Sequence, residues 1–253
     1  MLEYAPKGLV GVLTPQANTT VEAEFSILKP PSIGLITSRL TSKKPTINSR
    51  LIEYINQIDN NLEEFANAPL KTVLFACTGA SYFFESTEEK EYLKKISSRR
   101  GYPIISATTA ISDALNVIKP KKIGIISPYN DELHNKAMSY WKKIPYNIKV
   151  IKRLKQKKNN FHPIYTIQTS TTKNCLYEIE SENCDLILFL GTGLPTLPAI
   201  LDNKSNLIVI SANLCLIWRT CLIIENQKPS QKNLEEWYTG IKWRNRFFSL
   251  VSR

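Results

Sequence analysis

The chain alternates short apolar runs with longer amphipathic stretches over most of its length. The runs are rich in Val and Ile and are bounded by Pro, Gly, Asn or Ser, a pattern that predicts buried β-strands. The stretches between them have the spacing of helices that bury one face. The expected strands are Leu9–Leu13, Ser32–Thr37, Thr72–Ala76, Ile104–Ile105, Lys122–Ile126, Ile148–Lys152, Leu186–Leu190 and Leu207–Ile210. The expected helices include Ile47–Ala66, Glu88–Arg99, Thr109–Val117 and Asp131–Lys143.

Continuous apolar strands that alternate with helices are typical of a parallel sheet covered on both faces, so the expected fold class is α/β. One short pattern occurs twice. Val73–Gly79 and Ile187–Gly193 are each an apolar strand that ends in Phe, one further residue, Cys or Gly, and then Thr-Gly. The two copies are separated by close to half the chain, which predicts a duplicated α/β unit. Ligands bind beyond the carboxyl ends of such strands, so Cys77 and Gly191 are expected on opposite walls of one cleft.

The repeat also predicts how the chain divides into domains. We expect an N-terminal domain of residues 1–112 plus 213–253 and a C-terminal domain of residues 113–212. The hinges are expected near residues 108–116 and 211–214. After Ser211 the chain is expected to return to the first half, so that Leu214–Arg253 packs on the N-terminal domain.

The composition is that of an ordinary globular protein, with 43% hydrophobic and 22% charged residues among 253. Lys and Arg outnumber Asp and Glu by 33 to 22, which gives a formal net charge of +11. A basic balance raises the question of a nucleic-acid partner. The basic residues are mostly lysines scattered through the expected helices, without an aromatic–basic alternation or a nucleic-acid motif. We therefore expect an anionic small molecule as the partner and no nucleic acid.

The sequence offers no obvious site for a cofactor. An odd number of cysteines without a CxxC pair argues against a closed set of disulfides. Only two histidines are present, and they lack the spacing of a metal site. There is no signal-peptide pattern, and the apolar stretch around Leu214–Ile224 is interrupted by Arg219 and too short to cross a bilayer. We expect no metal, no cofactor, no membrane association and a cytoplasmic location; a homo-oligomer is compatible with the sequence.

Cys77 is the strongest candidate for chemistry. It ends a buried strand and is followed by Thr78-Gly79-Ala80-Ser81, a small polar turn that opens a helix. Backbone N–H groups at such a turn bind anions and lower the pKa of a thiol. Its pKa is therefore expected below about 8.5, and Cys77 is expected to be alkylated before the other cysteines at pH 7. The alternative is a buried cysteine that acts as a small apolar side chain. Cys175, Cys184, Cys215 and Cys221 are interpreted as structural.

Polar side chains follow two other strands. Asn18 comes after the first strand, where its amide is placed to bind a substrate carboxylate. Asn18 or Thr19 is also a candidate helix cap, with Glu22 reaching back to complete a capping box. Tyr129 follows the fifth strand in the sequence Ser-Pro-Tyr-Asn and is expected either to face the cleft or to pack within its loop.

Taken together, these motifs resemble a known family. The motifs are Asn18-Thr19-Thr20-x-Glu22, Ala76-Cys77-Thr78, Ser127-Pro128-Tyr129, Gly191-Thr192-Gly193-Leu194-Pro195-Thr196-Leu197 and Ser211-Ala212-Asn213-x-x-x-x-Trp218. Their order and spacing, from Gly8 to about Trp218, are similar to those of maleate isomerases and arylmalonate decarboxylases. These enzymes are a branch of the aspartate/glutamate racemase superfamily.

The resemblance implies two pseudo-symmetric Rossmann-like domains with parallel sheets and an active site in the cleft between them. It implies chemistry without a metal, pyridoxal phosphate or nucleotide, on a small carboxylate or dicarboxylate. Cys77 matches the first-half cysteine, which is the nucleophile in maleate isomerases. The implied substrate-binding positions are Asn18, Thr78, Ser81, Tyr129, Gly191 and Gly193, and less securely Asn159 or Asn160.

One departure from the family pattern leaves the reaction open. Members that move protons on both faces of a carbon carry a second cysteine, and here that position is Gly191, followed by Thr192. In the first reading, Cys77 alone adds to or protonates the substrate, giving isomerisation or decarboxylation. In the second, Thr192 supplies the missing acid or base for a weak racemisation, although a neutral hydroxyl is a poor base at pH 7. In the third, the protein binds a small carboxylate without turning it over.

Overall fold

The computed structural model describes residues 2–84, 86–155, 163–203 and 207–251. Two four-stranded parallel sheets form the framework, and the strands of the two sheets follow the same order. The first sheet has the order β2-β1-β3-β4, with β1 Gly8–Pro15, β2 Ile33–Leu40, β3 Leu70–Phe75 and β4 Ile104–Ser106. The second has the order β6-β5-β7-β8, with β5 Lys122–Ser127, β6 Asn147–Arg153, β7 Leu186–Phe189 and β8 Ile208–Ser211. All eight expected strands and the α/β class are confirmed.

The register of the two sheets supports an internal duplication. Phe75 on β3 is paired with Ser106 on β4, and Phe189 on β7 is paired with Ser211 on β8. Both serines then cap the next helix, because the side chain of Ser106 accepts a hydrogen bond from the Thr109 N–H and that of Ser211 accepts one from the Leu214 N–H. The repeated pattern in the sequence therefore corresponds to equivalent strands in two copies of one α/β unit.

The expected helix over residues 47–66 is wrong in its length. The structure has two helices there, α2 Ile47–Asn56 and α3 Ile58–Glu63, which meet at Gln57. The break changes the direction of the chain, so that Tyr54 on α2 and Leu62 on α3 can both reach the core. A periodic pattern alone does not reveal such a bend. The other expected helices are confirmed as α5 Ser86–Arg100, α6 Ala107–Ile118 and α7 Asp131–Trp141.

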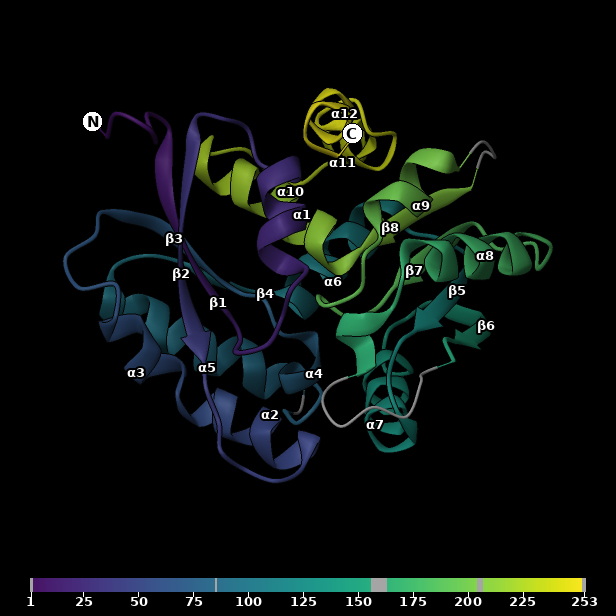
Figure 1. Ribbon diagram of the computed structural model, residues 1–253, viewed down its shortest axis with the longest axis horizontal. Helices are drawn as coiled ribbons and strands as arrows, with labels where there is room; N and C mark the ends of the chain where they lie inside the picture. Colours follow the sequence, from purple (N-terminus) through teal and green to yellow (C-terminus); the bar gives the residue numbers. More distant parts are fainter. Residues whose placement is uncertain (1, 85, 156–162, 204–206, 252–253) are drawn as a thin grey trace.

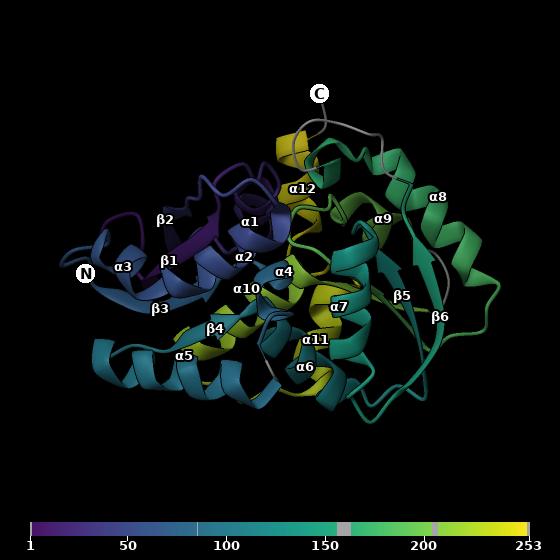
Figure 2. The same cartoon turned by 90° about the horizontal axis from the view of Figure 1, so that it is seen from below.

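The chain crosses between the two sheets twice. Helix α6 leads from β4 to β5, and α10 (Ala212–Ile224) leads back from β8. The two crossing helices pack against each other, and α10 also packs on β3 and on α1 (Val21–Leu28). Figures 1 and 2 show the two sheets side by side with α6 and α10 between them. This arrangement brings the carboxyl ends of the strands in both sheets toward a common space.

The C-terminal helices divide their contacts between the halves. Helix α12 (Arg244–Val251) packs on α1, while α11 (Gln231–Tyr238) packs on α6, α10 and β8. The return of the chain to the first half is therefore carried by α10 and α12, while α11 packs on β8 of the second sheet and on the two crossing helices. The domain boundaries at residues 112/113 and 212/213 remain predictions.

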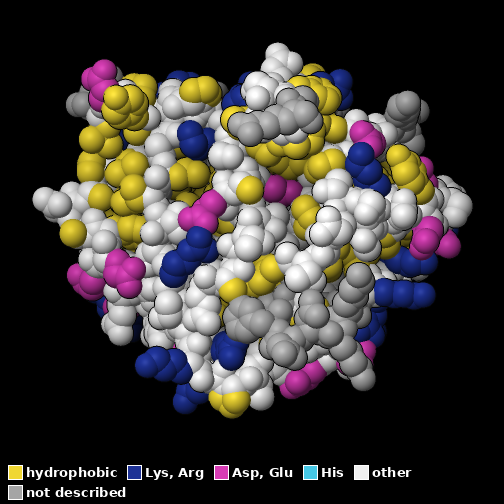
Figure 3. Space-filling model, viewed as in Figure 1, with side chains coloured by type: hydrophobic (Ala, Val, Ile, Leu, Met, Phe, Trp, Pro, Cys, Tyr) yellow, Lys and Arg dark blue, Asp and Glu magenta, His cyan; other side chains and the backbone are white. Residues whose placement is uncertain are grey.

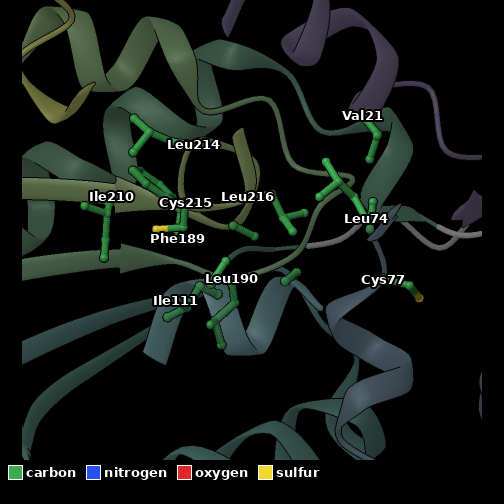
Figure 4. Close-up of a cluster of buried hydrophobic side chains, with 14 of the residues drawn as sticks. Val21, Leu74, Cys77, Ile111, Phe189, Leu190, Ile210, Leu214, Cys215 and Leu216 are labelled. Carbon is green, nitrogen blue, oxygen red and sulfur yellow. The ribbon is translucent and has the colours of Figure 1, made fainter. Parts of the chain in front are cut away.

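The hydrophobic core is continuous across the seam between the sheets. Figure 4 shows part of this cluster, in which Leu190 and Leu216 lie between residues of the two halves. Cys215 on α10 is fully buried within it. Within the described residues, no helix is long and apolar enough to cross a membrane. On the face shown in Figure 3, Lys and Arg side chains are scattered over the surface.

Candidate active site

One pocket lies where the carboxyl ends of the strands from both sheets meet. The last residue of β1 and residues that follow β3, β5 and β7 all contribute to its walls, which is the arrangement expected for a ligand site in open α/β sheets. The pocket and its mouth together span about 560 Å³ of space, a figure that includes open solvent. The lining residues are Pro15, Ile47, Leu51, Tyr54, Cys77, Thr78, Gly79, Pro128, Tyr129, Asn130, Leu133, Pro163, Ile164, Tyr165, Gly191, Thr192 and Gly193.

Cys77 lies in this pocket at the start of the one-turn helix α4 (Thr78–Ser81). Its side chain is 3% exposed, and Figure 4 shows the sulfur directed away from the other labelled side chains of the core. The backbone N–H groups of Gly79 and Ala80 lie close enough to the sulfur to act on the pKa of the thiol, which they lower. The turn therefore supplies the donors that the sequence predicts.

The pKa of Cys77 does not follow the expectation. Burial raises the pKa of the Cys77 thiol to about 12, and this effect outweighs the opposing hydrogen bonds from Ala80 and Gly79. The charge of Glu89, a buried carboxyl group on α5, raises the pKa of Cys77 further. The prediction of a pKa below about 8.5 is thus wrong for this ligand-free structure. The physical reason is that desolvation disfavours the thiolate more than two backbone donors favour it.

Thr78 and Tyr129 join the two halves inside the pocket. The distance between Thr78 Oγ1 and the hydroxyl oxygen of Tyr129 is 2.8 Å, a hydrogen bond in which either group can donate. The ring of Tyr82 packs edge-on against Tyr129, with 5.7 Å between ring centroids. The Tyr82 hydroxyl in turn accepts a hydrogen bond from the indole N–H of Trp141. Burial raises the pKa of Tyr129, so its hydroxyl is a neutral donor at physiological pH.

Gly191 and Gly193 form the opposite wall, and both positions are crowded. Gly191 has a φ of +89°, in the region that favours glycine. A Cβ atom there would lie 2.9 Å from Cγ of Pro128 and 3.0 Å from Cδ1 of Ile164. At Gly193 a Cβ atom would lie 2.4 Å from Cε1 of Tyr165. Both glycines therefore allow the backbone to approach the ligand space closely.

Thr192 lies between these glycines and is bonded to the first half of the chain. Its hydroxyl donates to the carbonyl oxygen of Ala76 at 2.9 Å. The side-chain amide of Asn18 donates to the same hydroxyl oxygen at 3.4 Å. The hydroxyl proton of Thr192 is thus held by a backbone carbonyl next to Cys77.

Asn18 is bonded to the start of a helix in the structure. Its side-chain oxygen accepts hydrogen bonds from the N–H groups of Thr20 and Val21 at the start of α1. The N-cap residue of α1 is Thr20, and Glu22 pairs with Arg39 on the surface, so the expected capping box with Glu22 does not form. Asn18 is 3% exposed and does not line the pocket. The structure places it one hydrogen bond behind Thr192.

One further expected substrate-binding residue, Ser81, is not among the described residues of the pocket wall. Ser81 is fully buried at the end of α4 and does not line the pocket. Asn160, and Asn159 beside it, lie outside the described residues. The structure therefore brings together Cys77, Thr78, Tyr129 and the Gly191–Gly193 loop, but not Ser81 or Asn18.

Several lining residues had no signal in the sequence. Tyr54 comes from the middle of α2, and its hydroxyl is buried without a partner among the described residues. Burial raises the pKa of Tyr54 to about 12. Tyr165 comes from the short 3₁₀ helix Pro163–Thr166. Neither residue follows a strand, so a search of strand ends does not find them. Among the described lining residues, none carries a charged side chain.

The pocket holds no cluster suited to a metal ion. No group of three or more His, Cys, Asp or Glu side chains with metal-binding geometry occurs in the parts of the chain that the structure describes. The chemistry available to the described residues is that of a thiol, phenol and threonine hydroxyls, and backbone N–H donors.

Comparison with known proteins places these features in a family context. A family model described as arylmalonate decarboxylase matches residues 10–234. No curated protein matches the sequence. A solved maleate cis-trans isomerase of Nocardia farcinica, a cysteine-to-serine variant with a covalently bound succinylcysteine intermediate, is 17% identical with a TM-score of 0.74. The alignment covers 87% of this chain and 93% of that one.

Two other solved structures have a similar fold. The maleate isomerase Iso of Pseudomonas putida S16 is 18% identical with a TM-score of 0.74, over 87% of this chain and 93% of its own. A liganded arylmalonate decarboxylase variant with one glycine-to-cysteine and one cysteine-to-serine replacement is 17% identical, with a TM-score of 0.72. It covers 86% of this chain and 92% of its own. At these identities the likeness concerns the fold.

Proposed function

We infer the function from the premise that this chain belongs to the arylmalonate decarboxylase family. We propose that it is a cofactor-independent enzyme of the isomerase and decarboxylase type. It acts on a small carboxylate or dicarboxylate through one thiol, that of Cys77. The observation that carries this proposal is the position of Cys77 at the start of α4, in a pocket whose opposite wall has glycine where a second thiol would stand.

Protonation of a carbanion is the reaction step that suits this thiol best. With a pKa of about 12, Cys77 carries its proton at neutral pH and is ready to act as an acid. On a malonate-type substrate, the bond between the central carbon and one carboxylate breaks and carbon dioxide leaves. The electron pair remains as an enediolate. The S–H bond then breaks as a new C–H bond forms, and solvent returns a proton to the thiolate.

The charges that develop in this step have donors nearby. The N–H groups of Gly79 and Ala80 stabilise the thiolate that remains after proton transfer. The hydroxyls of Tyr129 and Thr78, together with backbone N–H groups of the Gly191–Gly193 loop, are the candidates for holding the enediolate oxygens. Donors fixed in advance in a water-poor pocket stabilise a developing anion more strongly than water does.

Addition of the thiolate to a carbon–carbon double bond is the second candidate. The Nocardia farcinica variant holds a succinylcysteine, which contains a bond between sulfur and substrate carbon. In such a reaction the sulfur adds to one alkene carbon, rotation follows, and the C–S bond breaks to release the isomer. The high pKa of Cys77 disfavours this route, because little thiolate exists before the substrate binds.

The wall opposite Cys77 favours proton transfer at only one face of the substrate carbon. Gly191 supplies no acid or base there, and the hydroxyl of Thr192 already donates to Ala76. This arrangement argues against Thr192 as the second catalytic group of a racemase. A neutral hydroxyl without an adjacent base is also a weak proton acceptor.

A substrate panel in deuterium oxide tests the proposed function. The panel comprises substituted malonates, maleate and amino acids, and the readouts are carbon dioxide release, isomerisation and deuterium at the reacting carbon. We expect turnover of a malonate or of maleate, and deuterium delivered to a single face of any decarboxylated product. Exchange on both faces of an amino acid would indicate racemisation. Saturable binding of these compounds with no turnover would overturn the proposal in favour of a carboxylate-binding protein.

A further inference from the structure

A buried carboxylate connects the two halves next to the proposed active site. Glu24 lies on α1 of the first half and is 5% exposed. Its Oε1 atom accepts hydrogen bonds from the N–H groups of Thr196 at 2.5 Å and Leu197 at 3.2 Å, where α9 (Leu197–Asp202) begins. Its Oε2 atom accepts from the side-chain amide of Asn213 on α10 at 2.8 Å. One side chain of the first half thus binds two segments that follow β7 and β8 of the second sheet.

This carboxylate is linked to the pocket wall through Asn213. The same amide group of Asn213 that donates to Glu24 also donates to the carbonyl oxygen of Thr192 at 3.0 Å. The hydroxyl of Thr192 donates to the carbonyl of Ala76, the residue before Cys77. A continuous series of hydrogen bonds therefore runs from Glu24 to the strand end that carries the thiol.

A second link holds the same loop from α1. The hydroxyl of Thr20, at the start of that helix, donates to the carbonyl oxygen of Gly193 at 2.9 Å. The loop is thus held at the carbonyl of Thr192 by Asn213 and at the carbonyl of Gly193 by Thr20. The loop has no side chain of its own at either glycine to fix its position against Cys77. Its alignment depends on these hydrogen bonds.

We propose that Glu24 is a positioning residue that holds the Gly191–Gly193 loop in register with Cys77. Its carboxylate does not line the pocket and acts through Asn213 and Thr192. Four donors, including the Thr196 hydroxyl, point at its two oxygens, and a carboxylate accepts at both oxygens where an amide accepts at only one. This inference rests on the proposed function only in taking Cys77 as the reacting group.

Glu24→Gln is the direct test, with Glu22→Gln as the matched control on the same helix. Glu22 forms an exposed ion pair with Arg39, so its replacement removes a carboxylate without changing the hydrogen bonds between Glu24, Asn213 and Thr192. Glutamine at position 24 keeps the shape of the side chain, but its NH₂ group then faces a hydrogen-bond donor in place of a carboxylate oxygen. We expect Glu24→Gln to lower kcat about a hundredfold with a smaller change in KM, because the reacting groups lose alignment. Glu22→Gln is expected to stay within about twofold, as exposed ion pairs contribute little.

Alkylation of the cysteines supplies a readout that does not need a substrate. The probe is iodoacetamide, with rates obtained for each cysteine by peptide mapping. In Glu24→Gln the loop is expected to open locally, so that Cys77 reacts about tenfold faster than in the wild type. Cys215, fully buried on α10, reports global unfolding and is expected to keep its rate. If none of the substrates in the panel is turned over, that result counts against the proposed function. The alkylation rates would still test the role of Glu24.

The double variant Glu24→Gln/Asn213→Asp separates positioning from stability. An amide at position 24 can donate to a carboxylate at position 213, which restores the bond between α1 and α10. That carboxylate cannot donate to the Thr192 carbonyl, so the link to the pocket stays broken. We expect the double variant to regain the thermal midpoint that Glu24→Gln loses. Its kcat is expected to stay low, and its Cys77 is expected to stay fast to alkylate. Recovery of all three together, or a Glu24→Gln variant with wild-type kcat and alkylation, would overturn the inference. If Glu24→Gln alone does not fold, the double variant decides.

Discussion

The hydroxyl of Thr192 donates a hydrogen bond of 2.9 Å to the carbonyl oxygen of Ala76. This bond joins the glycine loop of one half to the residue that precedes Cys77 in the other half. Both groups are buried, so neither can turn to water if its partner is removed. Thr192 therefore has a structural role in the seam that is separate from any part in proton transfer.

Thr192→Val tests this role because it keeps the shape of the side chain and removes the hydroxyl. We expect the free energy of unfolding to fall by about 1–3 kcal/mol, since the carbonyl of Ala76 is left buried without a donor. Urea unfolding measures the change. An unaltered slope of the free energy of unfolding against urea concentration would show that the variant exposes the same surface on unfolding as the wild type.

Thr192→Ser is the control, because it retains the hydroxyl and loses one methyl group, at a cost of about 0.8 kcal/mol. The configuration of any product is expected to be the same for both variants and the wild type. A wild type that exchanges protons on both faces, together with a Thr192→Val variant that exchanges on one, would instead identify Thr192 as the second acid or base.

Gly191→Cys would place a thiol opposite Cys77, but the backbone conformation at Gly191 disfavours any side chain. At a φ of +89°, and with Pro128 and Ile164 within 3.0 Å of a new Cβ atom, we expect a loss of stability. Strained backbone of this kind costs about 1–3 kcal/mol before any crowding is added. Where the variant folds, exchange on the second face of a substrate is expected to appear or to increase, as measured by deuterium at the reacting carbon.

Gly101→Ala separates backbone strain from crowding. Gly101 has a φ of +77°, and a Cβ atom there would meet no other atom within 4 Å. Gly191→Ala is therefore expected to be less stable than Gly101→Ala in thermal or urea unfolding. Equal losses at the two glycines would mean that the contacts with Pro128 and Ile164 relax without cost, and that the second wall can accept a side chain.

The reactivity of Cys77 is expected to depend steeply on pH. Because burial raises its pKa to about 12, the thiolate fraction should increase about tenfold for each pH unit from 7 to 10, without a plateau. Cys184, which is only half-buried, is expected to react faster at pH 7, which reverses the order predicted from the sequence. Iodoacetamide rates at each cysteine test this, and a plateau for Cys77 near pH 8 would contradict it.

The sequence was a good guide to the framework and to one wall of the site. Val- and Ile-rich runs determine the strands, and a polar or small residue after each strand marks the edge where Cys77, Tyr129 and Gly191 meet. The same local rule does not describe the environment of the thiol. Helix α2 and the Pro163–Thr166 turn cover the pocket from elsewhere in the chain, so the burial that raises the pKa of Cys77 is a tertiary effect.

The other differences between the expected and the observed surroundings of the pocket have the same physical origin. Asn18 follows a strand, as a substrate-binding amide would, but in the structure both ends of its amide are engaged, by the start of α1 and by Thr192. Tyr54 lies on the buried face of a helix and lines the pocket, and its hydroxyl is buried without a partner among the described residues. Whether a polar group binds a substrate or its own backbone depends on which partners lie near, and these come from distant segments.

Replacement of Cys77 by serine shows whether this thiol performs the chemistry. The measurement is kcat in deuterium oxide on a substrate found in the panel, for the wild type, for Cys77→Ser and for the control Cys184→Ser. Serine keeps the size of the side chain but is a far weaker acid. We expect Cys77→Ser to be at least about a hundredfold slower, the usual scale for losing a positioned acid or base. We also expect Cys184→Ser to turn over at the wild-type rate. Full activity in Cys77→Ser would contradict the assignment.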